Sequence, residues 1–163
     1  MGKLSALHGR YEVECRRADG SLAWAAPIDN LVTDAGKNDL LDRYLGGGSA
    51  LTFSLGLING ASPTIAAADT MSSHAGWTEN QNYSASTRPT PSWNSASSKS
   101  KSTLSTTFAI NANSQTIGGL FIVSNNTKGG TSGVLYSAGT FTGGAKNANS
   151  GDTISVVYTA TAP

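Results

Sequence analysis

The sequence is poor in charge, and this shortage excludes several classes of protein. Only 13% of its 163 residues are Asp, Glu, Lys or Arg, about half the usual share. A coiled coil, a long helical bundle or a highly charged disordered tail would need more charge than this. The net charge is +1, so no field of the whole molecule favours binding to nucleic acid or to a membrane surface.

Cysteine and long apolar runs are equally scarce. Cys15 is the single cysteine, so the chain can form neither an internal disulfide nor a cysteine-based zinc site. The N-terminal segment lacks the apolar stretch of a secretory signal. No apolar run approaches the roughly 18 residues that a membrane-spanning helix needs. We therefore expect synthesis in a reducing cytoplasm and no membrane partner.

Histidine is limited to His8 and His74, and the sequence lacks the short motifs of phosphate-binding, dinucleotide-binding, zinc-protease and α/β-hydrolase enzymes. His74 stands five residues from Asp69, a spacing that does not share a helix face well, which disfavours a Ser-His-Asp triad. Glu12 and Glu14 lie about 7 Å apart on one strand face, as a glycosidase pair could. A solvated strand face paired with arginines is the simpler interpretation. We expect no catalytic residue, no cofactor and no metal site.

Small polar residues are what the sequence has in quantity. Serine and threonine together number 40, and glycine adds 19. Threonine favours strands, whereas glycine, asparagine and serine favour the turns between them. A chain of 163 residues can form one domain with a sizeable core. The short strands and Gly/Asn turns predict an all-β fold, a single jelly-roll-like β-sandwich over residues 1–163 with one prominent and one short helix.

The N-terminal region predicts a hairpin. Residues 10–17 alternate, with Tyr11 and Cys15 on the apolar face and charged side chains on the other. A turn and a second strand follow, and Pro27 is expected to end that strand. Ile28 to Thr33 is a candidate for a further short strand. Residues 1–33 are therefore predicted to form an N-terminal hairpin or arm.

One prominent helix is predicted over residues 34–46. Asp34 can cap its N-terminus, and three glycines stop it at the other end. We expect its apolar stripe to face the protein and Asp39, Asp42 and Arg43 to face solvent. The stripe consists of Leu40, Leu41, Tyr44 and Leu45.

Residues 47–163 are predicted to form the main β-sandwich. A short helix is expected over 66–75, with Asp69 as its cap, and a Ser-rich loop over 84–102. Gly118-Gly119 inside an apolar run predicts a bulge or a close approach of two backbones. Strands are expected at 51–58, 78–84, 103–110, 115–124, 134–141 and 153–161.

Two groups of residues are candidates for binding. Residues 1–79 hold six basic and nine acidic side chains, whereas 80–163 hold five and one, so unlike ends could meet in an oligomer or a complex. The candidate interface residues are Arg10, Arg16, Arg17, Arg88 and Trp93. The rings of Trp77, Tyr83 and Trp93 could stack on a glycan. The alternative is packing in the core for Trp77 and Tyr83 and an interface anchor for Trp93.

Six segments of the chain have a distinctive amino-acid sequence. They are YEVECRRADGSLAW, GKNDLLDRYL, ADTMSSHAGWTE, YSASTRP, TKGGTSGVLYSAGTF and SGDTISVVYTAT. These segments, which together hold 70 of the 163 residues, resemble a family of small structural proteins of tailed bacteriophages. The resemblance implies a virion protein encoded among the head and morphogenesis genes, without catalytic activity.

Within such a family two roles are open. A capsid decoration (cement) protein would bind the lattice of the major capsid protein and stabilise the head, whereas a fibre tip would bind host glycans. The chain has no shaft-like repeat, which favours decoration. We expect a homo-oligomer, a trimer or a dimer, on the capsid exterior of the virion, synthesised in the cytoplasm of the host bacterium. Neither nucleic acid nor a membrane is expected as a partner.

Overall fold

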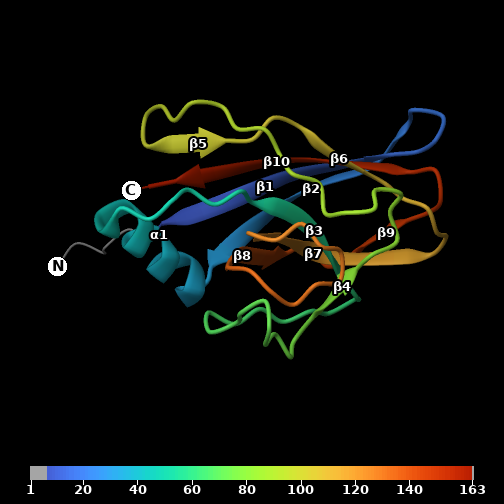
Figure 1. Ribbon diagram of the computed structural model, residues 1–163. Coiled ribbons are helices and arrows are strands. Elements are labelled where there is room, and N and C mark those ends of the chain that lie inside the picture. The colour runs from blue at the N-terminus through green and yellow to red at the C-terminus, as the bar shows by residue number, and fades with distance from the viewer. Residues whose placement is uncertain (1–6, 163) are drawn as a thin grey trace.

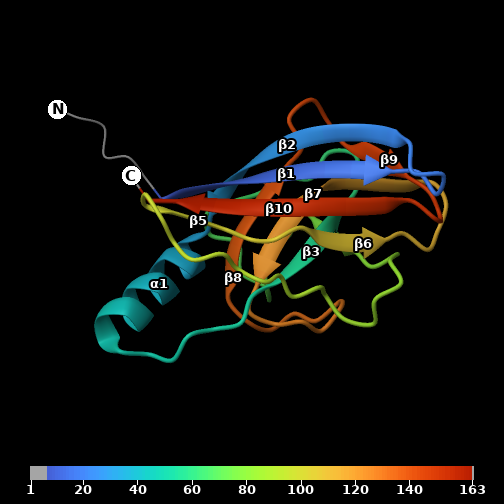
Figure 2. The same cartoon turned by 90° about the horizontal axis from the view of Figure 1, so that it is seen from above.

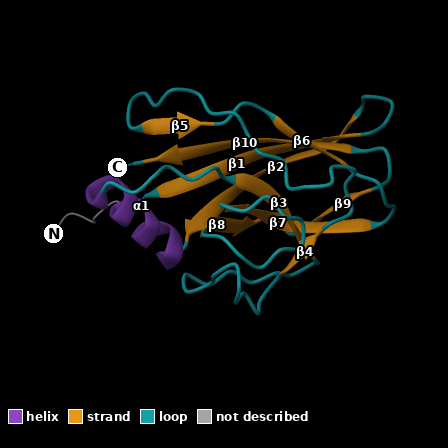
Figure 3. Ribbon diagram, in the orientation of Figure 1, coloured by secondary structure: helices purple, strands orange, loops and turns teal. Residues whose placement is uncertain are grey.

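The computed structural model describes residues 7–162, in which the chain forms ten β-strands and one α-helix (Figure 1; Figure 3). Strands account for 45% and helix for 8% of the chain, which confirms the all-β class. Residues 1–6 of the predicted N-terminal arm lie outside the described residues. The elements in chain order are β1 (His8–Arg16), β2 (Leu22–Val32), α1 (Asp34–Gly46), β3 (Ser54–Asn59), β4 (Thr78–Asn80), β5 (Ser100–Ser102), β6 (Thr106–Ala109), β7 (Gln115–Val123), β8 (Leu135–Thr140), β9 (Lys146–Ala148) and β10 (Thr153–Thr161).

The strands pair antiparallel into one sheet in the order β4-β3-β7-β8-β2-β1-β10-β5, with β6 on β10 and β9 on β7. β2 connects two groups of strands, because it pairs with β1 from Leu22 to Asn30 and with β8 at Leu31 and Val32. Figure 2 shows the consequence: β1, β2 and β10 run together and cross over β3, β7 and β8.

The main core lies between these two groups of strands. Tyr11 of β1 and Tyr158 of β10 pack together with Leu57 of β3 and Leu120 of β7, and all four are fully buried. A smaller cluster covers the other face of β7, where Phe121 packs with residues such as Trp77 and Met71. β7 is buried on both faces. This explains why its sequence is a continuous apolar run and not an alternation of apolar and polar residues.

The N-terminal hairpin occupies the centre of the sheet and is no arm beside it. The predicted alternation of β1 is confirmed, with Tyr11 and Cys15 buried and Arg10 exposed. Pro27 does not end the strand, contrary to expectation, and β2 continues to Val32. At Pro27, β2 pairs with β1 but not yet with β8, so the strand is locally an edge, where a missing N–H is tolerated.

The predicted helix over 34–46 is confirmed as α1, but its cap is Thr33, not Asp34. The Thr33 hydroxyl accepts a hydrogen bond from the amide of Gly36 at 3.0 Å, and Gly47 ends the helix in the left-handed conformation. A side chain at Gly36 would overlap with the backbone of Tyr136, so this glycine lets α1 lie directly against β8.

The predicted short helix over 66–75 does not form, and this segment consists of turns with a bridge between Thr70 and Ser73. The carboxylate of Asp69 accepts hydrogen bonds from the amide of Ala66 and the indole of Trp77. The Asp69 side chain, which was expected to cap a helix, therefore bonds to Trp77 and stabilises a turn instead.

Several strands are shorter than predicted. The strand expected at 51–58 begins at Ser54, and the one expected at 78–84 ends at Asn80. The Ser-rich loop 84–102 is mostly irregular, and it ends in the short strand β5. The predicted irregularity at Gly118-Gly119 is confirmed, since the register between β3 and β7 skips Gly118 and Gly119 lies against the backbone of Gly139.

Candidate interaction surfaces

The outward side of β1 carries four charged side chains in two ion pairs. Arg10 Nε lies 2.6 Å from Glu12 Oε1, and Arg16 Nε lies 2.5 Å from Glu14 Oε1. The hydrogen bond with Glu12 raises the pKa of Arg10 above its ordinary value. The arrangement is the solvated strand face with arginine partners that the sequence suggested, and Arg10 and Arg16 are exposed there as predicted.

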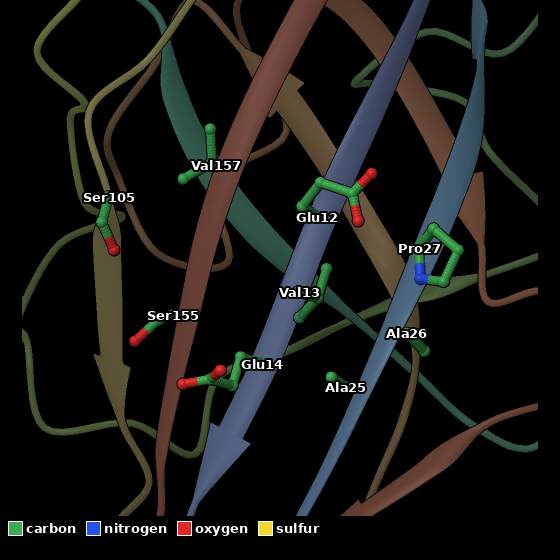
Figure 4. Close-up of a pocket in the computed structure, with 9 residues that line it drawn as sticks. All are labelled: Glu12, Val13, Glu14, Ala25, Ala26, Pro27, Ser105, Ser155 and Val157. Carbon is green, nitrogen blue, oxygen red and sulfur yellow. The ribbon is translucent and has the colours of Figure 1, made fainter. Parts of the chain in front are cut away.

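A shallow hollow lies beside these pairs on the outer side of β10, β1 and β2 (Figure 4). Its volume is about 460 Å³, and Glu12 and Glu14 lie in it. Small residues form the rest of the lining: Ala25, Pro27, Ser105, Ser155 and Val157, with the buried core residues Val13 and Ala26 between them. We call these residues, with Arg10 and Arg16, the sheet face. Its small side chains leave the two carboxylates accessible to a partner.

The two other predicted interface arginines, Arg17 and Arg88, form ion pairs within the chain, but only Arg88 is enclosed, since the Arg17 side chain is 43% exposed. Arg17 Nη1 lies 2.8 Å from Asp152 Oδ2, and that carboxylate is buried. Arg88 is itself buried, which corrects its assignment as a surface contact. Its guanidinium forms an ion pair with Glu79 at 2.8 Å, and both side chains are almost completely removed from solvent. A buried arginine cannot reach a partner without unfolding its surroundings.

Two of the three candidate glycan-binding rings belong to the core. Trp77 is buried and stacks on His74 with ring centroids 3.9 Å apart. Tyr83 is fully buried against Phe108, and burial raises its pKa above the ordinary tyrosine value. The alternative interpretation, packing in the core, holds for both residues. Of the three rings, Trp93 alone is partly exposed.

Helix α1 is oriented opposite to expectation. Its polar pair, Asp39 and Arg43, lies against the body with side chains 15% and 32% exposed and 2.8 Å apart. Arg43 also donates to the carbonyl of Ser49, which ties the returning chain to the helix. The apolar stripe is left in solvent, with Leu40 46%, Leu41 55%, Tyr44 86% and Leu45 76% exposed. The close contact at Gly36 sets this rotation of the helix.

A groove opens between α1 and the rest of the molecule. It comprises two adjoining hollows of about 340 and 390 Å³ that share Leu40, Leu51, Phe53 and Tyr136. Trp93 and Lys101 form the wall away from the helix, and Lys101 Nζ lies 6.0 Å from the centre of the Trp93 ring. We call this the helix groove. Sequence reasoning found Trp93 but missed the other wall residues, because they come together only in the fold.

The edges available for strand addition are few. β1 lies between β2 and β10, and β3 lies between β4 and β7. The strands at 10–16 and 51–58 have few edge-blocking prolines, which would allow a neighbouring chain to extend the sheet there. Because both strands already have neighbours on both sides, that extension is blocked. The ends of the strand order are β4 and β5, with three residues each.

No group of three or more His, Cys, Asp and Glu side chains within residues 7–162 is placed to hold a metal ion. His74 Nδ1 lies 3.0 Å from the carbonyl oxygen of Trp77, and Asp69 bonds to Trp77 and Ala66, so neither residue is arranged as part of a triad. Burial raises the pKa of the Cys15 thiol to about 11. The described residues contain no helix with the length and apolar character needed to span a membrane.

Comparison with known protein families, curated proteins and solved structures finds no match to this chain. The sheet face, the helix groove and the resemblance of the six sequence segments are therefore the features that bear on function.

Proposed function

We propose that this chain is a non-enzymatic structural protein of a tailed bacteriophage virion. In this proposal it is a capsid decoration (cement) protein that binds the lattice of the major capsid protein and stabilises the head. It is synthesised in the cytoplasm of the host bacterium and is located on the capsid exterior. The proposal involves no cofactor, no nucleic acid and no membrane.

The observation that carries the proposal is the sheet face. A protein that covers a capsid needs a broad, rigid surface, and the long strands β1, β2 and β10 provide one. Exposed ion pairs such as Arg10–Glu12 contribute little to folding, so a partner can exchange them for its own charges at little cost. The resemblance to small phage structural proteins includes most of β1, the start of β2 and all of β10.

The fold is consistent with this role. We propose that the folded ten-stranded sheet is a jelly-roll-like β-sandwich, with the main core between its two groups of strands. Such a body resists deformation because its core is close-packed, and it can hold a flat face in place against a lattice.

The alternative, a fibre tip that binds host glycans, loses support from the burial of two of its three rings. Trp77 and Tyr83 present no ring face to solvent, and Trp93 by itself would offer a single stacking platform. No other observation in the described residues favours glycan binding over protein binding.

The test is binding of the purified protein to capsids of the phage that encodes it, prepared without it. Ser155→Arg places a long charged side chain on the sheet face and should weaken cosedimentation at least ~10-fold. Thr131→Arg is the matched control on an exposed loop and should bind as the unmodified protein does.

Failure of the unmodified protein to bind capsids would overturn the proposal. A quantitative gel of the virion separates the roles, since hundreds of copies mean decoration and a few dozen or fewer mean a fibre or neck. Measurable turnover of host polysaccharide or cell wall, lost on changing Glu12, Glu14 or His74, would establish an enzyme instead.

A further inference from the structure

The exposed stripe of α1 is the least expected surface of the molecule. A helix that packs on a protein normally buries its apolar side chains and exposes its charges. Here the Asp39–Arg43 ion pair faces the body, and Tyr44 and Leu45 are 86% and 76% exposed. Contiguous apolar surface of this kind marks an interaction site.

The stripe and the helix groove together form a self-complementary surface. The helix protrudes from the molecule (Figure 2), and the groove opens beside it. Leu40 and Tyr44 line the groove themselves, so the protruding and hollow parts are adjacent on one chain. A two-fold axis places the protruding part of each copy over the hollow part of the other, because the same patch meets itself in such an interface.

The charges beside this surface favour the same arrangement. Asp42 is exposed on α1 and forms no ion pair within residues 7–162. Lys101 lies in the groove wall, where its Nζ donates to the carbonyl of Asn94 at 2.9 Å and has no acidic partner among the described residues. Across a two-fold axis, Asp42 of each copy can approach Lys101 of the other, which gives two identical pairs of unlike charge.

The area is of the right order for a dimer. If a large apolar side chain offers about 150–200 Å² when exposed, the four stripe residues together expose on the order of 400–500 Å² per copy. The walls of the groove, with Phe53 and Trp93, bring this toward the roughly 800 Å² per partner of a standard interface.

We propose that two copies of this chain form a two-fold symmetric dimer in which the apolar stripe of each α1 covers the stripe and the helix groove of the other. The interface is apolar at its centre, with Leu41, Tyr44 and Leu45 as its anchors. The Asp42 and Lys101 side chains lie at its rim. This dimer uses a different surface from the sheet face, and it does not depend on the capsid proposal.

The experiment is sedimentation equilibrium of the full chain across a range of concentrations. The unmodified protein should be a dimer, and the double variant Leu41→Glu/Leu45→Glu should raise its dissociation constant at least ~100-fold. Leu22→Glu is the matched control, since Leu22 is 53% exposed and begins β2, the strand whose other end leads into α1. Circular dichroism and urea unfolding verify that each variant folds, as expected for changes at exposed positions.

A charge exchange tests the two-fold arrangement itself. Asp42→Lys and Lys101→Glu should each weaken self-association, because each brings like charges together at the rim. An equimolar mixture of these two variants should form a heterodimer in which both rim contacts again pair unlike charges, and it should bind more tightly than either variant alone. Failure of the mixture to do so, with both variants folded, would overturn the reciprocal contact.

A monomer at 100 µM, a trimer, or a dimer that the stripe variant leaves unchanged would each overturn the inference. A monomer whose binding to capsids is lost in Leu41→Glu/Leu45→Glu would also do so, since the capsid would then cover the stripe. If the protein is a monomer and binds capsids through the sheet face, the dimer is wrong but the decoration role stands. If it is a dimer and does not bind capsids, the decoration role is wrong but the dimer stands.

Discussion

At the scale of single residues, Arg88 is the charged side chain that the fold encloses most completely. It donates to Glu79 through Nε at 2.9 Å and Nη2 at 2.8 Å, and also to the carbonyls of Asn125 and Gly130. Glu79 accepts a further bond from the amide of Gly129. These contacts connect the Ser-rich loop to β4 and to the loop after β7. Because the charges of Arg88 and Glu79 are both buried, removing either one leaves the other buried without its counter-charge.

We expect Arg88→Met to lower the free energy of unfolding by about 3–5 kcal/mol, because it leaves the buried Glu79 carboxylate without its positively charged partner. Urea unfolding followed by tryptophan fluorescence measures the change. Arg16→Met, which removes a half-exposed arginine from β1, is the control and should have little effect. Equal effects of the two changes would contradict the structural role of Arg88.

Buried tyrosines and the buried cysteine make stability depend on pH in the alkaline range. Burial raises the pKa of Tyr11, Tyr83 and Tyr158 above their ordinary value of 10.0, and that of Cys15 from 9.0 to about 11. In the unfolded chain these groups lose their protons near the ordinary values, whereas the folded protein retains them. Above pH 9 the unfolded state therefore binds fewer protons, and stability falls as pH rises.

We expect the urea midpoint to be nearly constant from pH 7 to 8 and to fall progressively from pH 9 to 11. Tyr83→Phe is a matched test, because the Tyr83 hydroxyl has no hydrogen-bond partner among the described residues. This variant should retain its stability at pH 7 and show a shallower alkaline decline. A midpoint that rises above pH 9 would contradict the assignment.

At the scale of elements, the start of α1 is attached to the sheet, whereas its apolar stripe is left in solvent. Thr33 is buried, accepts from the amide of Gly36, and donates to the carbonyl of Leu135 in β8. One side chain thus caps the helix and attaches it to the sheet, while the apolar stripe contributes little to the folding of a single copy.

Thr33→Ala should lower the free energy of unfolding by about 1–2 kcal/mol, since both hydrogen bonds are lost. It should also speed hydrogen exchange in the first turn of α1, which a loss of core packing elsewhere would not do selectively. Thr107→Ala, at an exposed position in β6, is the control. Unchanged exchange in α1 would show that Thr33 does not hold the helix start.

At the scale of the whole molecule, the first and last strands lie side by side. His8 of β1 faces Thr161 of β10, and β10 lies between β1 and β5. Figure 1 shows the start of β1 and the end of β10 side by side, at the end of the molecule that carries α1. The two strands contribute Tyr11 and Tyr158, which lie 4.8 Å apart between ring centroids in the core.

A circular permutant that joins residues 161 and 8 by a short flexible linker and opens the chain between Gly143 and Gly144 should fold with similar circular dichroism. Both glycines lie in an exposed turn and have open space around them. Opening the chain between Gly119 and Leu120, inside β7, should abolish folding. A well-folded protein from the second permutant would contradict the central position of β7.

The local patterns of the sequence determined the elements with a clear period or a sharp boundary. The alternation of residues predicted that Tyr11 and Cys15 lie on the buried face of β1. The glycines after residue 45 predicted the end of α1, and the last strand lies at 153–161 as predicted. These features depend on neighbours along the chain, so they can be read without the fold. The resemblance to phage structural proteins likewise comes from the sequence.

Only the tertiary structure decided which side chains are buried by distant segments. Arg88 was expected at the surface of the Ser-rich loop, yet contacts with Glu79 enclose it. For Tyr83 the sequence left glycan binding and core packing open, and its contact with Phe108 decides for the core. The sequence predicted that the apolar stripe of α1 is buried, yet the contact of Gly36 with β8 rotates the helix so that the stripe faces solvent. Burial of these residues depends on strand pairing across the whole chain, which neither periodicity nor composition records.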